Sequence, residues 1–294
     1  MKISVLTPTY NRAGLLNRLY TSLIINSKYD VQIEWLIMND GSTDNTKKLI
    51  DEFVSEKIID IKYYEQENKG KMHALNTLMK KVTGDIIVEC DSDDYFTENA
   101  FQIVKKAYEE SKNEEDIYAL CFLKYDQEKN NIGQDFKKKK TTMFDLYFKE
   151  GEDGEKALVY YKDKRVNYSY ELEHGEKFVT EARLHHKIDL DYKIKCYNEP
   201  IMICEYQKDG YTRNIKKIFK ENPYGYFEYF KEIFDHDMTG VPLKKRLYVI
   251  KHYILFGTLT NSKNIISNVK GKLNKLLVIL LLIPGKIMTK IKMK

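Results

Sequence analysis

Four polar residues, Asp91-Ser92-Asp93-Asp94, directly follow an apolar run that ends at Cys90. A short run rich in β-branched residues favours a buried strand, so these carboxylates are expected at its carboxyl end, where open α/β sheets bind ligands. Carboxylate oxygens suit Mg²⁺ or Mn²⁺, ions that commonly bind between one or two protein carboxylates and the phosphates of a substrate. The pattern therefore predicts a metal and diphosphate site. The alternative is that Asp94 or Thr97 only caps the next helix.

Strand and helix patterns alternate through the first 125 residues, and these elements must position the acids. The expected strands cover residues 3–7, 33–38, 58–64, 85–90 and 117–123, and the expected helices cover residues 13–26, 46–57, 72–81 and 97–110. This alternation predicts an α/β fold with a doubly wound, mostly parallel sheet flanked by helices. Its strand ends would bring residues 8–12, Asn39-Asp40-Gly41 and the acids to one edge, which strengthens the prediction of a site.

The rest of the chain has weaker patterns. Residues 126–156 are polar and lysine-rich, and we expect loops or weak structure there, near the site. A helix over residues 181–188 precedes two short strands, over residues 192–196 and 201–205. Four widely spaced cysteines without a Cys-x-x-Cys pair indicate reduced thiols in a cytoplasmic protein, and no signal-peptide pattern precedes the first strand.

The C-terminal segment differs sharply in charge from the rest. The whole chain carries a net charge of +5, yet residues 238–294 hold twelve Lys or Arg and no Asp or Glu, so residues 1–237 carry −7. A wholly basic segment on an acidic body predicts a polyanionic partner. Leu243, Leu247, Ile250 and Ile254 recur at helical spacing.

An apolar run, Leu276–Ile283, lies among the lysines of this segment. Its eight residues are too few to span a bilayer, which takes roughly 20. We therefore predict a basic amphipathic helical extension that lies on a membrane surface with anionic lipids. Simple packing of this extension on the body is the alternative. Nucleic acid is not expected as a partner, because no recognisable nucleic-acid-binding module accompanies the charge.

Four motifs in the first 94 residues together resemble family 2 glycosyltransferases of the GT-A fold. In chain order they are residues 5–12, which end in Pro8-Thr9-Tyr10-Asn11-Arg12, residues 35–44 around Asp40-Gly41, residues 67–76 around Gly70-Lys71, and residues 84–94, which end in the four polar residues. The resemblance is strong over residues 1–125 and weaker over residues 170–230, where Glu205-Tyr206 and Asp209-Gly210 look like the family's later segment.

The resemblance implies an inverting transfer of a sugar from a nucleotide-diphosphate donor. Carried over to this chain, the donor-binding residues are Pro8, Tyr10, Arg12, Asp40, Lys71, Asp91 and Ser92, and Asp93 binds Mn²⁺ or Mg²⁺. Asp40 would accept an N–H from the base, which favours a pyrimidine and hence a UDP-sugar. Two alternatives remain open: Asp40 could simply begin an Asx turn before Gly41, and Lys71 could be a solvated residue in the first turn of its helix.

The acceptor side needs a general base for the attacking hydroxyl. Many relatives place it in a Glu-Asp pair at the start of a helix, and the matching pair here is Glu181-Ala182. We assign the base to Glu181, with Glu176 and then Asp94 as alternatives. The adjacent His185 and His186 point about 100° apart on a helix and are poorly arranged to bind one metal ion.

The resemblance assigns residues 1–125 to the nucleotide-sugar-binding half of a GT-A domain and residues 126–235 to its acceptor-binding half. The charge and the apolar pattern described above assign residues 236–294 to the membrane-associating extension. The single tryptophan, Trp35, excludes the Gln-x-x-Arg-Trp motif of processive relatives, so we expect one sugar per reaction. The expected acceptor is lipid-linked or a cell-surface glycan, at the cytoplasmic face of the membrane. Two alternatives are a catalytically impaired donor-binding partner protein, suggested by Ala182, and a nucleotidyltransferase.

Overall fold

The computed structural model describes residues 1–205 and 214–292, with side chains up to residue 289. The chain forms two compact units that interleave along the sequence. Unit 1 comprises Met1–Thr141, Glu152–Ser169 and Asp191–Lys208, and unit 2 comprises Thr142–Gly151, Tyr170–Leu190 and Asp209–Lys294. Each unit has a hydrophobic core of its own.

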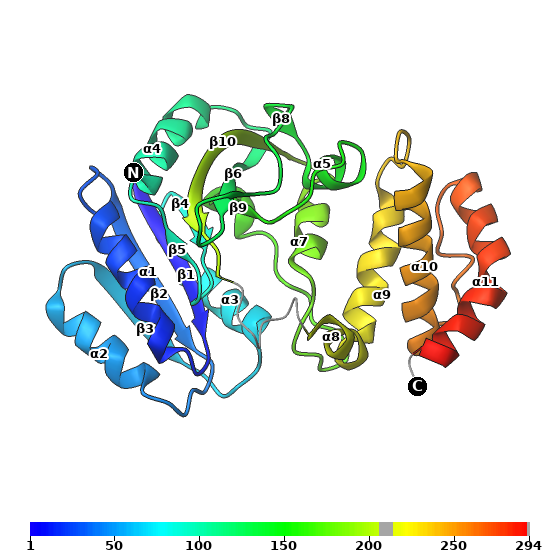
Figure 1. The fold of residues 1–294 in the computed structure, drawn as a ribbon, viewed down its shortest axis with the longest axis horizontal. Helices are drawn as coiled ribbons and strands as arrows, with labels where there is room; N and C mark the ends of the chain where they lie inside the picture. Colours follow the sequence, from blue (N-terminus) through cyan, green and yellow to red (C-terminus); the bar gives the residue numbers. More distant parts are fainter. Residues whose placement is uncertain (206–213, 293–294) are drawn as a thin grey trace. The chain divides into compact units, whose positions relative to one another are not determined.

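Unit 1 is built on a mixed, mostly parallel sheet (Figure 1). Its strands run in the order β3-β2-β1-β4-β9-β6-β10-β5, with β7 beside β6 and β8 beside β10. Strands β3, β2, β1 and β4 are parallel, β6 is parallel to β10, and β9 is antiparallel to both of its neighbours. The strands are β1 (Lys2–Thr9), β2 (Gln32–Asn39), β3 (Asp60–Glu65), β4 (Ile86–Glu89), β5 (Tyr95–Phe96), β6 (Ile117–Tyr125), β7 (Asn131–Ile132), β8 (Lys140–Thr141), β9 (Lys156–Tyr161) and β10 (Lys193–Ile203). The predicted doubly wound, mostly parallel fold is confirmed.

Helices cover both faces of this sheet. The helices of unit 1 are α1 (Ala13–Asn26), α2 (Thr46–Glu56), α3 (Lys71–Met79), α4 (Ala100–Ser111) and α6 (Lys162–Arg165). Side chains of α1, α2 and α4 share one core with alternate residues of the strands, and α3 packs on β1 and β2 without joining that core. Trp35 lies in the core, stacked with Tyr20 and Phe53, and its ring N–H donates to the Thr7 hydroxyl at 2.9 Å.

Two parts of the sheet differ from the sequence prediction. Strand β9 lies in the centre of the sheet, although its residues belong to a stretch with no predicted element. The two short strands expected over residues 192–196 and 201–205 are instead one strand, β10, whose pairing with β6 is irregular between Tyr197 and Met202. Pro200 explains the irregularity, because a proline has no N–H to donate to the ladder.

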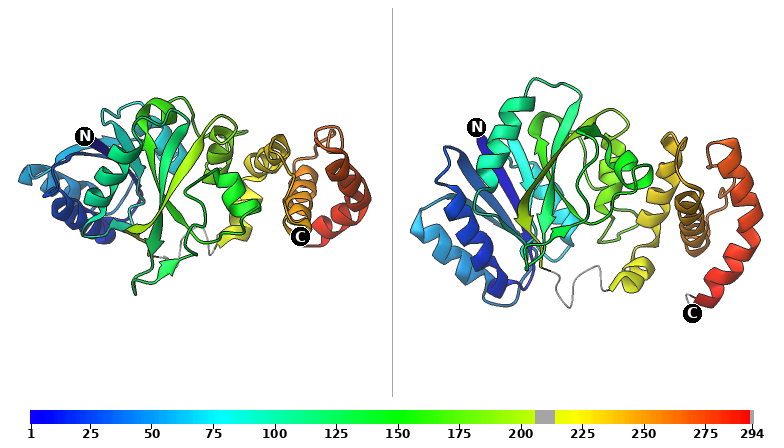
Figure 2. Two further views of the ribbon diagram at one scale, coloured as in Figure 1. Left: turned by 90° about the horizontal axis from the view of Figure 1, so that it is seen from above. Right: turned by 45° about the horizontal axis from the view of Figure 1, so that its top comes forward.

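Unit 2 is helical. It consists of α5 (Met143–Phe148), α7 (Glu181–Ile188), α8 (Ile215–Glu221), α9 (Pro223–Glu232), the short 3₁₀ helix η2 (Ile233–Asp235), α10 (Leu243–Leu259) and α11 (Lys272–Lys292). Helix α10 packs against both α9 and α11, side by side in both views of Figure 2. The predicted helix over residues 181–188 and the predicted C-terminal helical extension are both confirmed.

The two C-terminal helices bury only part of their apolar surface. Ile250 and Ile254 of α10 are buried, but Leu243 and Leu247, expected on the same face, are 59% and 36% exposed. On α11, Val278 is buried, whereas a row of apolar side chains on the other side of the helix is exposed: Leu273, Leu276, Ile279, Leu280, Ile283, Ile287 and Met288. No helix of the described residues combines the length and hydropathy needed to cross a membrane.

Candidate active site

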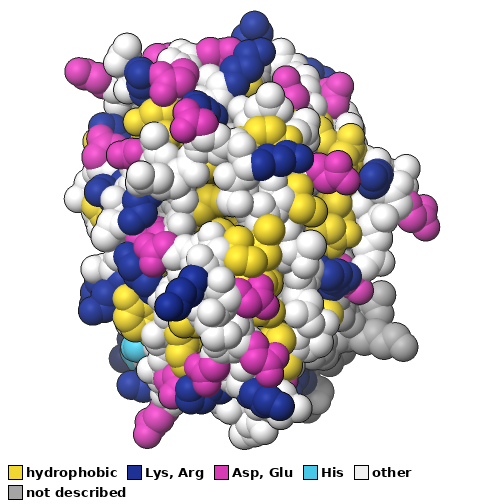
Figure 3. Space-filling view, turned by 90° about the vertical axis from the view of Figure 1, so that its left-hand side faces the viewer, with side chains coloured by type: hydrophobic (Ala, Val, Ile, Leu, Met, Phe, Trp, Pro, Cys, Tyr) yellow, Lys and Arg dark blue, Asp and Glu magenta, His cyan; other side chains and the backbone are white. Residues whose placement is uncertain are grey.

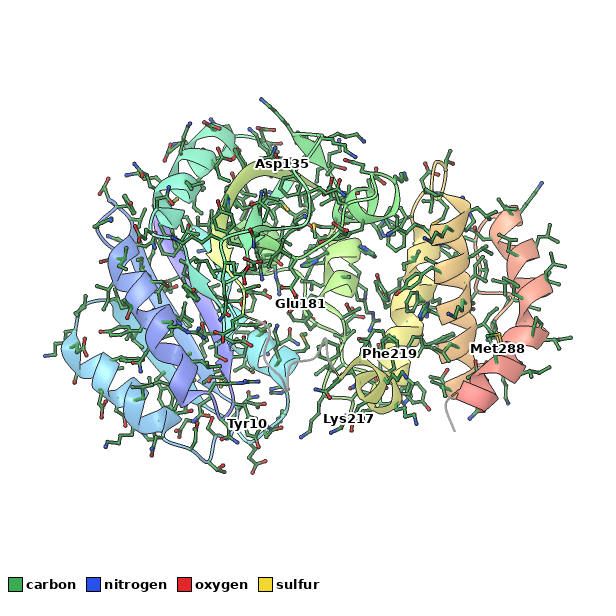
Figure 4. All side chains as sticks on the ribbon, viewed as in Figure 1. Tyr10, Asp135, Glu181, Lys217, Phe219 and Met288 are labelled. Atoms are coloured by element: carbon green, nitrogen blue, oxygen red, sulfur yellow. The ribbon has the colours of Figure 1, made fainter. Side chains whose placement is uncertain are left out.

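The carboxyl ends of the parallel strands gather the predicted donor-binding residues of unit 1 at one edge of the sheet. Pro8 is buried near the end of β1, opposite Met38 of β2. Tyr10, 47% exposed, follows β1 (Figure 4), and Arg12 immediately precedes α1. Asp40 follows β2, and Asp91, Ser92 and Asp93 follow β4. The order of the strands thus brings three stretches that are distant in sequence to one edge.

Asn11 ties the loops after β1 and β2 together. Its backbone N–H donates to the Ser42 hydroxyl at 2.9 Å, and its side-chain oxygen accepts the N–H of Thr43 at 2.8 Å. Asn11 adopts a left-handed conformation with φ of 52°, which asparagine tolerates better than most residues. The loop that carries Tyr10 and Arg12 is therefore fixed against its neighbour.

Asp40 is buried and holds the loop between β3 and α3. Its Oδ1 accepts the Gln66 side-chain N–H at 2.7 Å and the Lys69 backbone N–H at 2.8 Å, and its Oδ2 accepts the Gly70 backbone N–H at 2.9 Å. The Asx turn considered for Asp40 is not formed, because the Ser42 N–H that it would use donates to the side-chain oxygen of Asn39 at 2.9 Å. Oδ2 of Asp40 accepts one of these bonds, and a carboxylate oxygen has capacity for two.

The close approach of this loop also explains the glycine after Asp40. Gly41 has φ of +79°, and a Cβ there would lie 3.1 Å from the backbone nitrogen of Asn68. Both the backbone conformation and the contact therefore favour glycine. The Asp40-Gly41 pair positions the donor loop in addition to any contact with a nucleotide.

Lys71 begins α3 and forms an ion pair with Asp91. Its Nζ lies 2.7 Å from Asp91 Oδ2, and its side chain is only 16% exposed. The alternative of a solvated first-turn lysine is therefore wrong. The contact brings a cation of the loop after β3 to the acids after β4, an arrangement that suits a diphosphate.

Asp93 lies in a crowded acidic environment. Burial and the charge of Asp94 raise the pKa of Asp93, and the charges of Arg12 and Lys71 partly oppose that increase. Ser92 beside it is buried. The described residues contain no group of three or more His, Cys, Asp or Glu able to enclose a metal ion. A Mg²⁺ or Mn²⁺ ion shared with a diphosphate needs only one or two protein carboxylates, so Asp93 with Asp91 fits such an ion.

A partly buried cluster beside these acids was not found from the sequence. Lys124 Nζ, at the end of β6, lies 3.1 Å from Asp94 Oδ2, 3.4 Å from Glu155 Oε2 and 3.4 Å from the Cys204 sulfur. Burial lowers the pKa of Lys124, but the negative groups around it outweigh this and raise its pKa well above the usual value. The residue before α4, Asn99, makes no capping bond, and the side chain of Asn26 accepts the N–H of Phe101 in the first turn at 2.9 Å, so the capping role considered for Asp94 and Thr97 is wrong.

The predicted acceptor-side residues belong to unit 2. Glu181 is the first residue of α7 (Figure 4). Arg183 on the same helix is buried, and its guanidinium forms two 2.9 Å bonds to the carboxylate of Glu232 on α9. Glu176 caps α9, because its two carboxylate oxygens accept the backbone N–H groups of Tyr224 and Gly225, each at 2.7 Å. This structural role weakens the case for Glu176 as the general base.

Other residues considered from the sequence have local roles. His73 of α3 contacts the side-chain oxygen of Gln66 at 3.1 Å. His186 is buried in an aromatic cluster of unit 2 with Phe144, Phe148, Tyr229 and His236. All four cysteines are buried thiols that form no disulfide in the described part of the chain. Tyr206, Asp209 and Gly210 of the weaker resemblance lie outside the described residues.

Comparisons with known proteins agree with this arrangement. The model of the family described as Glycosyl transferase family 2 matches residues 4–165. An uncharacterized glycosyltransferase of Mycoplasma pneumoniae, the MG025 homolog, is 36% identical over 103 residues, which are 34% of this chain and 34% of that protein. The matched stretch thus spans about a third of the relative's length.

Solved structures extend the likeness in fold to nearly the whole chain. Staphylococcus aureus TarS 1–349 in complex with UDP-GlcNAc has a TM-score of 0.64 at 16% identity, over 98% of this chain and 89% of that one. The mannosyltransferase PcManGT of Pyrobaculum calidifontis, in complex with GDP-Man and Mn²⁺, has a TM-score of 0.57 at 15% identity, over 98% and 83%. At these identities the likeness concerns the fold.

Proposed function

Because the chain belongs to glycosyl transferase family 2, whose model matches more than half of it, we propose that it transfers one sugar, with inversion, from a nucleotide-diphosphate donor to an acceptor hydroxyl. The observation that carries the proposal is the convergence of the loops after β1, β2 and β4 at one sheet edge, with Lys71 paired to Asp91 there. The UDP-GlcNAc complex of TarS, which shares the fold, supports a UDP-sugar as donor.

Each donor-side residue has a role that its surroundings support. Asp40 would accept an N–H of the base with the remaining capacity of Oδ2, beside the rigid loop after β1 that carries Tyr10 and Arg12. Lys71 would exchange part of its contact with Asp91 for the diphosphate, which is also negatively charged. Asp93 would hold Mn²⁺ or Mg²⁺, and Asp91 would hold the ribose or the water shell of the ion. When bound, the ion stabilises the negative charge that develops on the leaving diphosphate.

We assign the general base to Glu181, which holds the first position of the pair that matches the family's Glu-Asp pair. The other two candidates have structural roles: Glu176 accepts two backbone N–H groups of α9, and the Asp94 carboxylate pairs with Lys124. A glutamate at the start of α7 would take the proton of the acceptor hydroxyl as this oxygen attacks the anomeric carbon. Residues 126–235 would then contribute the acceptor side of the site.

We propose a lipid-linked or cell-surface glycan as acceptor, reached at the cytoplasmic face of the membrane by a peripherally bound protein. Two features support this location. Residues 238–294 carry no acidic side chain, whereas basic and acidic side chains are mixed on the face of unit 1 in Figure 3. Helix α11 exposes apolar side chains beside exposed Lys272, Lys275 and Lys286, the composition of a helix that lies in an interface.

A titration of the purified full chain with UDP, dTDP, GDP and CDP, with and without Mn²⁺, tests the donor site. We expect one pyrimidine diphosphate to raise the melting temperature in a metal-dependent way, and Asp93→Ala to abolish the metal dependence. No shift with any nucleotide would refute the donor site. Since TarS and PcManGT bind donors with different bases, the preferred nucleotide also limits the set of sugars that the donor can carry.

A turnover assay distinguishes an active enzyme from the second candidate, a catalytically impaired donor-binding partner protein, which Ala182 favours. We expect donor hydrolysis or transfer that releases nucleoside diphosphate, and Glu181→Gln to lower kcat by roughly 10²–10⁴-fold while donor affinity is retained. Donor binding without any turnover would favour the partner protein. Release of pyrophosphate would indicate a nucleotidyltransferase, although residues 8–14 contain no glycine-rich phosphate loop.

A further inference from the structure

The Lys124 cluster joins four segments at the sheet edge that carries the donor site. Its members are Asp94 in the turn after β4, Lys124 at the end of β6, Glu155 just before β9, and Cys204 just after β10. The Cys204 thiol lies 3.2 Å from Asp94 Oδ2 and 3.3 Å from Glu155 Oε2. The side chains of Lys124 and Asp94 are 13% and 8% exposed, so their charges face each other largely away from water.

Asp94 connects this cluster to the predicted metal ligand, Asp93. Its backbone N–H donates to the carbonyl of Asp91 at 3.1 Å and so closes the turn that carries Ser92 and Asp93. The side chain of Asp94 therefore anchors one end of that turn to the sheet. Any change that draws the Asp94 carboxylate out toward water would move Asp93 with it.

Lys124 is the cation that makes this anchor stable. A buried carboxylate that loses its partner is strongly unfavourable, and it either takes up a proton or moves to water. The ammonium lies between two carboxylates and a thiol, and the shortest of its three contacts is the one to Asp94.

We propose that Lys124 is a positioning residue for the metal-binding turn, which it holds through Asp94 so that Asp93 is presented to the cation and its diphosphate. This inference rests on the proposed function, because it assumes that Asp93 binds Mn²⁺ or Mg²⁺. It gives Asp94, the fourth residue of the motif, a structural role and not the role of general base.

Mn²⁺ binding to the full chain in the presence of UDP tests the proposal without turnover, by calorimetry or by electron paramagnetic resonance of free Mn²⁺. We expect Lys124→Met to weaken Mn²⁺ binding about 10–100-fold, the range for removal of a group that supports a metal ligand. Lys124→Arg should restore most of the affinity. UDP affinity at saturating Mn²⁺ should change little. A general loss of structure would instead weaken the binding of both Mn²⁺ and UDP.

Lys62→Met is the matched control. Lys62 Nζ lies 2.7 Å from the carboxylate of Glu34, which is fully buried near the amino end of β2, at the opposite end of the strands from the donor site. We expect this variant to lower the melting temperature and leave Mn²⁺ affinity unchanged. Equal losses of Mn²⁺ affinity in both variants would overturn the proposal.

The double variant Lys124→Met/Asp94→Asn keeps the test valid if Lys124→Met does not fold, because it leaves no uncompensated charge on residue 94. We expect it to fold and to bind Mn²⁺ with the affinity of Asp94→Asn alone. Failure of the wild type to bind Mn²⁺ with UDP would refute the metal in the proposed function. Two results would refute only the role of Lys124. The first is a Mn²⁺ affinity in Lys124→Met equal to that of the wild type. The second is the wild-type Mn²⁺ affinity in the double variant together with a reduced affinity in Asp94→Asn.

Discussion

The exposed apolar row on α11 leads to a quantitative prediction for membrane binding. Leu280, Ile283 and Ile287 are 63%, 72% and 56% exposed, and at 100° per residue they lie within one 60° arc of the helix. Glutamine is compatible with a helix, so replacing all three residues by glutamine preserves α11 and removes most of the apolar surface on this arc. The perturbation therefore tests the surface and not the fold of the helix.

The exposed fractions set the size of the effect. Complete burial of a leucine or isoleucine side chain contributes about 1.5–3 kcal/mol, and roughly two-thirds of each of these side chains is still exposed, so the three together contribute about 4 kcal/mol. Since about 1.4 kcal/mol corresponds to a factor of ten, the triple variant should bind vesicles roughly a thousandfold more weakly.

Flotation with vesicles of neutral phosphatidylcholine, with and without anionic phosphatidylglycerol, measures this partition. A second variant with Lys272, Lys275 and Lys286 changed to glutamine should lose about 1 kcal/mol per lysine on anionic vesicles and little on neutral ones. The control replaces Val54, Ile58 and Leu190, apolar residues outside α11 that are 42%, 49% and 54% exposed, by glutamine. We expect the control to bind like the wild type.

Two results would refute this reasoning. Wild-type flotation of the α11 triple variant would mean that the exposed row does not contact lipid. A wild-type dimer in solution that becomes monomeric in the triple variant would mean that a second copy covers the row. The charge argues against the second copy, because residues 238–294 carry no acidic side chain to face the lysines of another α11.

Further predictions concern unit 2. Glu176→Ala removes both acceptors from the start of α9. It should lower the free energy of unfolding by about 1–3 kcal/mol, or the melting temperature by several degrees, while kcat falls little. A large loss of kcat at an unchanged melting temperature would instead favour Glu176 as the general base. Burial and nearby histidines lower the pKa of His186, and burial lowers the pKa of His236, so both stay neutral in the folded state below pH 6.5, where the unfolded chain takes up protons. Thermal unfolding should therefore show stability falling as the pH drops below about 6.5, by up to about 1.4 kcal/mol per pH unit for each histidine. His186→Phe should reduce this slope, and an unchanged slope would place the titrating group elsewhere.

Local sequence patterns were sufficient to predict the parallel strands and to identify the residues that follow them. Strand β9 escaped prediction because its partners β4 and β6 are far away in sequence, and residues 156–161 have no alternation of their own. Helix α10 was predicted at the right place, but periodicity alone did not reveal that Leu243 and Leu247 stay exposed. Burial depends on the neighbouring helices as well as on spacing.

The same limit applies to the candidate site. The resemblance identifies Asp40 as a base-binding residue. Its bonds to Lys69 and Gly70 involve backbone N–H groups, whose positions cannot be inferred from residue types. Lys124 had a weak signal, because it is a single lysine near the end of an otherwise apolar strand, and Cys204 lies just after the end of its neighbour β10. Their proximity to Asp94 depends on strand order, which the sequence pattern does not specify.

The central position of β9 has a consequence for synthesis of the chain on the ribosome. Strand β4 pairs with β1 on one side and with β9 on the other, and about 70 residues separate the end of β4 from the start of β9. At translation rates of about 5–20 residues per second, β4 presents an unpaired apolar edge for roughly 3–14 s while the nascent chain grows. Such an edge invites pairing with other chains, so efficient expression should depend on chaperones that shield the first four strands until β9 emerges.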